Sequence, residues 1–401
     1  MAGWFPKRGA RLLSFNLRVL HVPLWAGFTY AVVLFFGHQF AEGHDPDEGN
    51  DPPLVQADIL VPQGFSVTTF ASGLNRPTSI AYGPDGALYI AQQDGLILRA
   101  ADINDDGVAE GVTRFAQGFD QPLGIAFRGS ALYVSSRTII SVVEDQNRDG
   151  VADTRSDIIT GLPALGNHQN NGVAFSPDDR LYIGHGSTTN LGPEPSPMNA
   201  AILRANPDGS ELTVFASGLR NPYDLAFNSA GDLFATDNGA DDPLASPPDE
   251  LNHVIEGGHY GFPKYHGDAP ETSGTISPLV KLPPHSAATG IAEWLDGDLF
   301  IALWNNTPGS QNVVRVRLFR QGNRYEAQSE EFATGFEHPI DVTVSPDNHL
   351  TVADYNGTIY QITVEDARLN VVAQQRSVQP QGKLAVAWGQ VKQNTARGVQ
   401  R

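Results

Sequence analysis

Oxygen-bearing side chains recur at a fixed spacing in two short acidic segments. In residues 102–110 they stand at positions 1, 3, 5 and 9, and residues 145–153 repeat that spacing. The side chains concerned are Asp102, Asn104, Asp106, Glu110, Asp145, Asn147, Asp149 and Asp153. Ca²⁺ takes roughly six to eight oxygen ligands, and a tight loop with glycine at position 6 wraps alternate side chains around one centre. The spacing predicts two structural calcium sites; the alternative is a pair of acidic turns that bind no metal.

A histidine and an arginine occupy matching places in two neighbouring segments of the chain. His168 precedes one short apolar run, and Arg220, followed by Asn221, precedes the next. A guanidinium holds a nearby imidazole neutral, which suits a general base, and it can also stabilise an oxyanion. The residues alone leave two alternatives open, namely that His168 is a structural loop histidine and that His185 is the base.

A third segment concentrates acidic residues. Five acids fall within the fourteen residues 237–250, and the glycine and alanine of Gly239-Ala240 lie among them. This density favours a second kind of cation site. The alternative is a solvated acidic loop.

The elements that must position these residues belong to one repeat, which occurs six times. Each copy has an apolar strand ending in a motif such as Phe-Ala-x-Gly-Leu, then Pro or Asn, a short apolar strand, and a turn with Asp and Gly before Leu-Tyr or a variant. One such sheet cannot bury both of its faces, whereas sheets stacked around an axis can. The sequence predicts an all-β, six-bladed β-propeller over residues 58–365, with a β-sandwich or an open solenoid as alternatives.

The regions outside the repeats predict export. Basic residues precede an apolar stretch, Val19–Phe40, which predicts a membrane anchor or a cleaved signal peptide in residues 1–40. Either one places the domain outside the cytoplasm, in the periplasm or at the cell surface, and an anchor makes the membrane a partner. Residues 41–57 are an acidic linker, and residues 366–401 form a basic tail that is expected to be disordered.

Composition excludes several functions. The formal net charge of -19 repels phosphate backbones, so no nucleic-acid partner is expected. The chain has no cysteine, which excludes disulfides, thiolate metal sites and covalently attached haem. Any electrons that the protein extracts must therefore leave to an external acceptor.

A series of motifs resembles a known enzyme family. Arg220-Asn221-Pro222, residues 236–239, Asp249-Glu250-Leu251-Asn252 and Tyr260-Gly261-Phe262-Pro263 follow in the order and spacing seen in the soluble quinoprotein (PQQ-dependent) glucose/sorbosone dehydrogenases. The resemblance covers about residues 58–365. It implies an oxidoreductase, dependent on pyrroloquinoline quinone (PQQ) and calcium, that oxidises an aldose, a sorbosone-like sugar or a polyol.

The resemblance also implies roles for individual residues. His168 matches the catalytic base, Arg220 and Asn221 match contacts to the quinone oxygens, and the carbonyls of Gly239 and Ala240 match calcium ligands. Trp304 remains from a His-Gly-Ser-Trp-Asn motif that here reads Ile301-Ala302-Leu303-Trp304-Asn305, and Asn238-Gly239-Ala240 stands where His-Gly-Pro is common. Arg315 is a candidate for a late cationic contact to the cofactor.

Two other functions fit the same repeats. A non-catalytic, calcium-stabilised propeller for binding or adhesion would fold and take a ligand without redox turnover. A lactonase-like hydrolase would need several side-chain carboxylates and an Asn converging on an axial metal, which the Gly239-Ala240 carbonyl pair disfavours.

Overall fold

The computed structural model describes residues 59–164, 166, 168–242 and 245–365. Contacts divide the chain into two units, 1–55 and 56–401, and all described residues lie in the second. The expected anchor or signal peptide, the linker and the basic tail fall outside the described residues. Within the described ranges no helix has the length and apolar character needed to cross a membrane.

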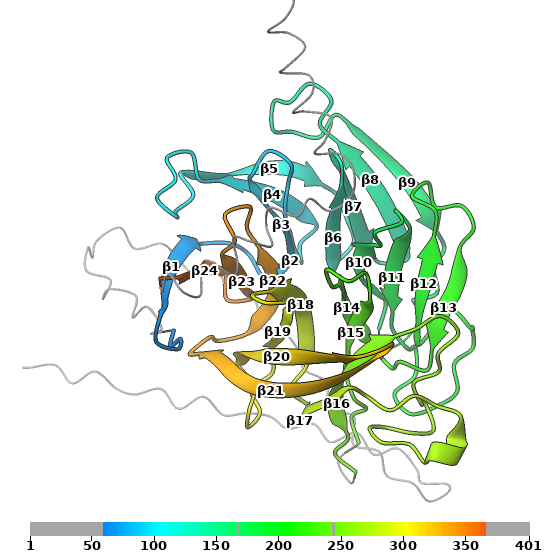
Figure 1. Cartoon of the computed structure of the whole chain (residues 1–401). Coiled ribbons are helices and arrows are strands. Elements are labelled where there is room, and N and C mark those ends of the chain that lie inside the picture. Colours follow the sequence, from blue (N-terminus) through cyan, green and yellow to red (C-terminus); the bar gives the residue numbers. More distant parts are fainter. Residues whose placement is uncertain (1–58, 165, 167, 243–244, 366–401) are drawn as a thin grey trace, which may run out of the picture. The chain divides into compact units, whose positions relative to one another are not determined.

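Six antiparallel sheets of four strands are arranged as blades around a central axis, which confirms the predicted all-β propeller (Figure 1). Blades 1 to 3 consist of β2 (Pro77–Tyr82), β3 (Leu88–Gln92), β4 (Leu96–Ala101), β5 (Gly111–Gln117), β6 (Gly124–Arg128), β7 (Ala131–Ser136), β8 (Ile139–Glu144), β9 (Thr154–Thr160), β10 (Asn170–Phe175), β11 (Leu181–His185), β12 (Ala201–Ala205) and β13 (Thr213–Ser217). Blades 4 to 6 consist of β14 (Pro222–Phe227), β15 (Leu233–Asp237), β16 (Pro248–Val254), β17 (Val280–Pro284), β18 (Ala288–Trp294), β19 (Asp298–Leu303), β20 (Asn312–Gln321), β21 (Arg324–Thr334), β22 (Pro339–Val344), β23 (Leu350–Asp354), β24 (Thr358–Val364) and β1 (Phe65–Ala71).

The ring is closed by the first strand of the propeller. β1 pairs with β24 in antiparallel register, from Phe65 opposite Val364 onward, and so becomes the outer strand of blade 6. Each sequence repeat is accordingly offset from a blade, because it contains the outer strand of one blade and the two inner strands of the next.

The repeated Leu-Tyr motif accounts for the core. Its leucine is the first or second residue of the second strand of each blade and is almost fully buried at all six places. These residues are Leu88, Leu132, Leu181, Leu233, Leu299 and Leu350. Burying one such side chain contributes about 1.5–3 kcal/mol, so the repeat specifies a core that lies between successive blades.

Two insertions depart from this regular plan. The segment between β16 and β17 is long and contains the short 3₁₀ helix η1 (Glu271–Ser273), as expected from the longer repeat interval there. The β20–β21 hairpin has strands of 10 and 11 residues, longer than those of the other blades.

Candidate active site at the propeller mouth

The predicted catalytic residues lie at one end of the inner hairpins. In register, Asn170 faces His185, Pro222 faces Asp237 and Pro339 faces Asp354, so these pairs mark the same level in three blades. The loops just beyond that level carry His168 and Arg220. We call this end of the propeller the mouth.

Backbone hydrogen bonds join the mouth loops of blades 3 and 4. The amide of His168 donates to the carbonyl of Ser187 (3.1 Å), and the amide of Ser187 donates to the carbonyl of Arg220 (2.7 Å). A Cβ placed on Gly186 would lie 2.4 Å from His168 Cβ and 2.6 Å from Asn221 Oδ1. The structure therefore brings His168, Arg220 and Asn221 together, and Gly186 is the residue that permits their close approach.

His168 is held in a defined tautomer. Its Nδ1 lies 3.0 Å from the carbonyl oxygen and 3.2 Å from the hydroxyl of Ser187. A carbonyl oxygen only accepts, so Nδ1 carries the proton and Nε2 keeps the basic lone pair. Burial, and secondarily the charge of Arg220, lower the pKa of His168 to about 4. The imidazole is therefore neutral at pH 7 and available as a base.

Ser187 is a residue that the sequence patterns did not single out. It is fully buried, and its hydroxyl donates to the carbonyl of Thr189 (2.7 Å). Glu194 accepts from the amides and hydroxyls of Thr188 and Thr189 at 2.7–2.9 Å, which fixes the loop that carries Ser187.

Arg220 is a buried cation, with 4% of its side chain exposed. Its guanidinium donates to the backbone and side-chain oxygens of Asn190 (3.2 and 2.7 Å) and to the carbonyl of Asn238 (3.3 Å). The carboxylate of Asp241, 3.4 Å away, is 76% exposed and therefore screened by solvent. Burial lowers the pKa of Arg220, but the group stays charged.

Buried carboxylates fix the backbone of the mouth from below. Asp237 accepts from the amides of Arg220 (2.9 Å) and Asn221 (2.6 Å). Asp249 accepts from the amide of Gly239 (2.7 Å). In blade 6, the Asp354 carboxylate accepts from the amides of residues 337 and 338, at 2.8 and 2.9 Å. Asp237 and Asp249 of the third acidic segment thus hold the mouth loops through hydrogen bonds from backbone amides. The exposed Asp241 of the same segment lies beside Arg220.

Gly239 and Ala240, the predicted calcium ligands, follow β15 beside Arg220. Ala240 is fully buried, and its carbonyl accepts from the amide of Asp242 (2.9 Å), which leaves one lone pair on that oxygen. A Cβ on Gly239 would lie 2.5 Å from the carbonyl oxygen of Pro248, so no side chain fits there.

Gly239→Ala is therefore expected to displace this loop, lowering cofactor affinity at least tenfold and stability by about 1–3 kcal/mol, as overpacking does. Denaturant unfolding and cofactor titration measure the two effects. Gly111→Ala on β5 is the matched control, because a Cβ there has no atom within 4 Å. Equal behaviour of the two variants would contradict the tight packing inferred at Gly239.

Trp304 lies at the mouth in blade 5, within an aromatic group that the sequence only partly indicated. Its ring stacks on His338 (centroids 4.6 Å apart, planes at 27°), and Tyr355 meets it edge-on at 5.9 Å. The buried indole Nε1 has no hydrogen-bond partner among the described residues. His338 precedes Pro339 as Asn221 precedes Pro222, and that repeat position was the available signal for it.

Two candidates are not brought into this group. Arg315 lies on β20, where its guanidinium pairs with Asp298 (2.6 Å) at the opposite end of β19 from Trp304. Its direction follows from strand register, which the sequence did not determine. His185, the rival base, is fully buried on β11 with neither ring nitrogen bonded among the described residues, and burial lowers its pKa to about 4.

The first predicted calcium loop is assembled in the structure. Ligand atoms of Asp102, Asp106 and Glu110 all lie within 4.8 Å of one another. Asp102 accepts from the amide of Gly107 (2.7 Å), which turns the loop around these oxygens. The amide of Ala109 donates to the carbonyl of Phe70 on β1 (2.9 Å), so the loop also contacts blade 6.

The second loop has the same backbone turn, but its acids are not gathered in that way within the described chain. Asp145 accepts from the amide of Gly150 (2.8 Å), as Asp102 does from Gly107. Asp153 is one methylene shorter than Glu110, and it accepts from the amides of Gln146 (2.7 Å) and Asn147 (3.1 Å). Those bonds hold its carboxylate against the loop backbone.

The mouth fits a cofactor with quinone or carboxylate oxygens. Apart from the exposed Asp241, the buried guanidinium of Arg220 is bonded to neutral oxygens, so its charge is available to an anionic or polarised oxygen. Gly239 and Ala240 add backbone carbonyls, one of the oxygen types that bind calcium.

Comparisons with known proteins agree with the resemblance seen in the motifs. Quinoprotein glucose dehydrogenase B of Acinetobacter calcoaceticus is 24% identical over 261 residues, which is 51% of this chain and 54% of that protein. The chain thus spans about half the length of this curated relative.

Solved structures show the same fold. A PQQ-bound aldose sugar dehydrogenase of Streptomyces coelicolor superposes with a TM-score of 0.61 and 23% identity, covering 76% of this chain and 99% of that one. A calcium structure of the Trichoderma reesei Carbohydrate-Active Enzymes Family AA12 gives 0.68 and 16%, covering 79% and 99%. The sequence profile described as "Domain of unknown function (DUF7133)" matches residues 56–384. This chain therefore belongs to the DUF7133 family, and its propeller is related to the quinoprotein glucose dehydrogenases.

Proposed function

We propose that this protein is a PQQ- and calcium-dependent oxidoreductase that oxidises an aldose, a sorbosone-like sugar or a polyol and passes the electrons to an external acceptor. The observation that carries the proposal is a half-buried, neutral imidazole with a fixed tautomer, His168, beside the buried guanidinium of Arg220. The sequence relationship to a quinoprotein glucose dehydrogenase supports it. The similar Streptomyces dehydrogenase is bound to PQQ, which supports the choice of cofactor.

Each mouth residue has a place in this chemistry. A bound quinone would supply the oxidising capacity, as the acceptor for the hydride (one proton and two electrons) that the sugar carbon loses. His168 Nε2 accepts the hydroxyl proton of the substrate, while Ser187 keeps the ring oriented through Nδ1. Arg220 and Asn221 would hold the cofactor oxygens, and the carbonyls of Gly239 and Ala240 would hold its calcium.

Reconstitution of the purified protein tests this function. Incubation with PQQ and Ca²⁺, followed by desalting, is expected to leave a bound-quinone absorbance and to permit sugar-dependent reduction of an artificial dye. Quinone uptake without turnover on a panel of sugars would favour a binding or adhesion propeller. Hydrolysis of lactones without quinone uptake would favour the hydrolase.

We also propose that the loop of residues 102–110 binds a structural Ca²⁺. Adding Ca²⁺ to metal-free protein is expected to raise Tm by roughly 5 °C, since a ligand at 100 times its Kd stabilises by about 2.7 kcal/mol. Glu110→Gln is expected to remove most of that shift, as measured by calorimetry. Glu326→Gln, an exposed acid on β21, is the control. An unchanged calcium response in Glu110→Gln would refute the site.

The basic residues before Val19–Phe40 support a location outside the cytoplasm, in the periplasm or at the cell surface. Fractionation of cells that express the full chain, with and without residues 1–40, tests this location. Recovery of the intact chain in the cytoplasmic fraction would count against it.

A further inference from the structure

The loop that joins β11 to β12 contributes a second residue to the mouth besides Ser187. Residues 186–200 form this loop, and Asn190 lies three positions after Ser187, outside every motif described above. Its hydrogen bonds reach two other segments of the mouth, one before β14 and one after β15. Asn190 thus lies where three segments of the site meet.

The side-chain amide of Asn190 has a fixed orientation. Its Oδ1 accepts from the backbone amide of Asp241 (3.1 Å), and its Nδ2 donates to the backbone carbonyl of the same residue (3.1 Å). An amide N–H only donates and a carbonyl only accepts, so these two bonds decide which end of the side chain is the oxygen. The same Oδ1 accepts from Arg220 Nη2 (2.7 Å).

Asn190 holds the Arg220 guanidinium at two points. Besides the bond to Nη2, its backbone carbonyl accepts from Nε (3.2 Å). These bonds are shorter than those from the guanidinium to the Asn238 carbonyl (3.3 Å) and to the Asp241 carboxylate (3.4 Å). Because two different nitrogens are bonded to one residue, both the position and the plane of the guanidinium are fixed.

The loop that carries Asn190 is itself held by Glu194. The Glu194 carboxylate accepts from the amides and hydroxyls of Thr188 and Thr189, which stand between Ser187 and Asn190. Ser187 orients the imidazole of the proposed base, and Asn190 orients the guanidinium beside it. One loop therefore positions both groups.

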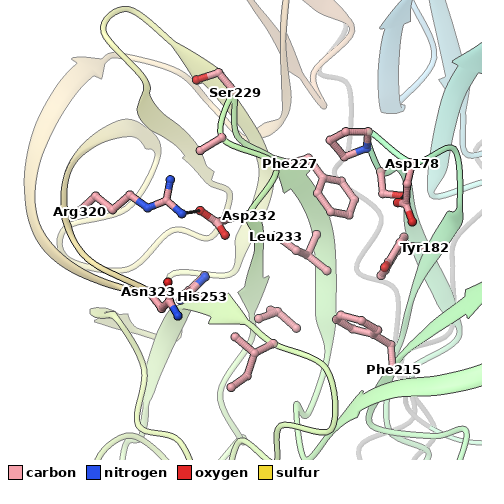
Figure 2. Close-up of a pocket in the computed structure, with 16 residues that line it drawn as sticks. Asp178, Tyr182, Phe215, Phe227, Ser229, Asp232, Leu233, His253, Arg320 and Asn323 are labelled. Carbon is pink, nitrogen blue, oxygen red and sulfur yellow. Dashed lines mark hydrogen bonds and ion pairs between the residues drawn. The ribbon is translucent and has the colours of Figure 1, made fainter. Parts of the chain in front are cut away.

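The partner of Arg220 differs from that of other arginines in the described chain. Figure 2 shows Arg320 beside Asp232, in a cleft at the end of the propeller opposite the mouth, where the guanidinium lies 3.4 Å from the carboxylate. Similar pairs join Arg99 to Asp85, Arg128 to Asp179 and Arg315 to Asp298. A carboxylate compensates the charge of its arginine, whereas the neutral oxygens of Asn190 hold Arg220 without compensating its charge.

We propose that Asn190 is a positioning residue, which holds the Arg220 guanidinium in the orientation that binds an anionic or polarised oxygen of the cofactor. This role rests on the proposed function, which assigns Arg220 to the quinone oxygens. Asn190 acts through Arg220 and does not need to touch the cofactor. That dependence distinguishes it from a residue that only stabilises the loop.

Equilibrium dialysis of PQQ against the calcium-loaded full chain tests the role in binding. Asn190→Ala is expected to weaken PQQ binding about tenfold or more, the usual effect of removing a hydrogen bond to a charged group. Asn206→Ala is the matched control, because Asn206 is a partly exposed asparagine on the turn after β12 that bonds Ser210 (2.8 Å) at the other end of that strand. Equal PQQ affinity in the two variants would contradict the proposed role.

NMR titration of His168 in the cofactor-free chain gives a readout that loop stability alone does not move. Burial, and secondarily the charge of Arg220, lower the pKa of His168. A guanidinium released from Asn190 turns toward solvent, so Asn190→Ala is expected to raise that pKa. In the Arg220→Gln background, the same substitution is expected to leave the pKa unchanged, because the positioned group is absent. An equal rise in both backgrounds, or no rise in either, would overturn the role.

Asn190→Asp tests why the acceptor is neutral. An aspartate keeps acceptors for the guanidinium and for the Asp241 amide, but its charge compensates that of Arg220. PQQ binding is therefore expected to weaken at least tenfold although the guanidinium stays held, and affinity equal to that of the unaltered chain would show that neutrality is not required. If the unaltered chain binds no PQQ, the proposed function fails; if it binds PQQ and Asn190→Ala binds equally, only the role of Asn190 is wrong.

Discussion

Replacing His168 with alanine is expected to lower kcat/KM for the sugar by about 10²–10⁴-fold, the usual contribution of a positioned general base. In the proposed function this neutral imidazole is the base, and Ser187 fixes its orientation through Nδ1. Steady-state dye reduction by the reconstituted protein measures this effect. Binding of PQQ and the melting temperature are expected to change little, because Arg220 and its hydrogen bond to Asp237 are unaltered.

His349→Ala is the matched control for this variant. His349 is a part-buried histidine on the turn between β22 and β23, at the other end of the strands from the mouth. Equal activity in the two variants would remove His168 from the chemistry. Restored activity in His168→Ala on addition of free imidazole would strengthen the base assignment.

The depressed pKa of His168 also fixes the pH dependence. The base acts only when deprotonated, so kcat/KM is expected to rise with pH through about 4 and to level off above it, instead of rising through 6.5 as a free imidazole would require. NMR titration of His168 in the cofactor-free protein measures the same pKa without turnover. Arg220→Gln removes the second cause of the shift and is expected to move the midpoint upward.

Asp237→Asn is expected to be the most damaging single change beneath the mouth. The carboxylate accepts from the amides of both Arg220 and Asn221, and an amide side chain can accept with its oxygen only, so one N–H would face an NH₂ group. Leaving a buried donor unsatisfied costs about 1–3 kcal/mol. Chemical denaturation is expected to show that loss of stability, together with a loss of quinone binding of at least tenfold.

Asp354→Asn provides a control with the same chemistry in another blade. Asp354 is fully buried, and it accepts from two consecutive amides at the equivalent place in blade 6. It is expected to lose similar stability while keeping the Arg220 loop intact. Loss of quinone binding in both variants to the same extent would show that the effect is global unfolding and not local positioning.

Most of the fold was predictable because each repeat carries two independent signals. The Leu-Tyr motif sets the buried residue of each second strand, and the turn with Asp and Gly sets where the inner hairpin reverses. Since blades are stacked copies, residues at one repeat position meet at one end of the ring. The repeat alone therefore predicts that His168 lies near Arg220.

The remaining parts of the site depended on details that no periodicity contains. Ser187 orients His168 through a bond that arises only when two loops of one blade meet, and a buried serine has no distinctive sequence signal. Arg315 is paired with Asp298 away from the mouth, because strand register decides which way its side chain points. The sequence identified Asp237 as an acid in a possible cation site. It did not indicate that Asp237 accepts hydrogen bonds from the backbone amides of a different loop.

The pairing of β1 with β24 has a consequence for how the protein is made. Phe65 meets Val364, so the final sheet assembles only after nearly the whole propeller sequence has left the ribosome. Contacts between residues so distant in sequence slow folding. A second contact joins blade 6 to blade 1: the amide of Ala109, in the acidic loop of residues 102–110, donates to the carbonyl of Phe70 on β1. If that loop binds the metal ion proposed above, the ion would strengthen the contact between blades 1 and 6 at the place where the ring closes.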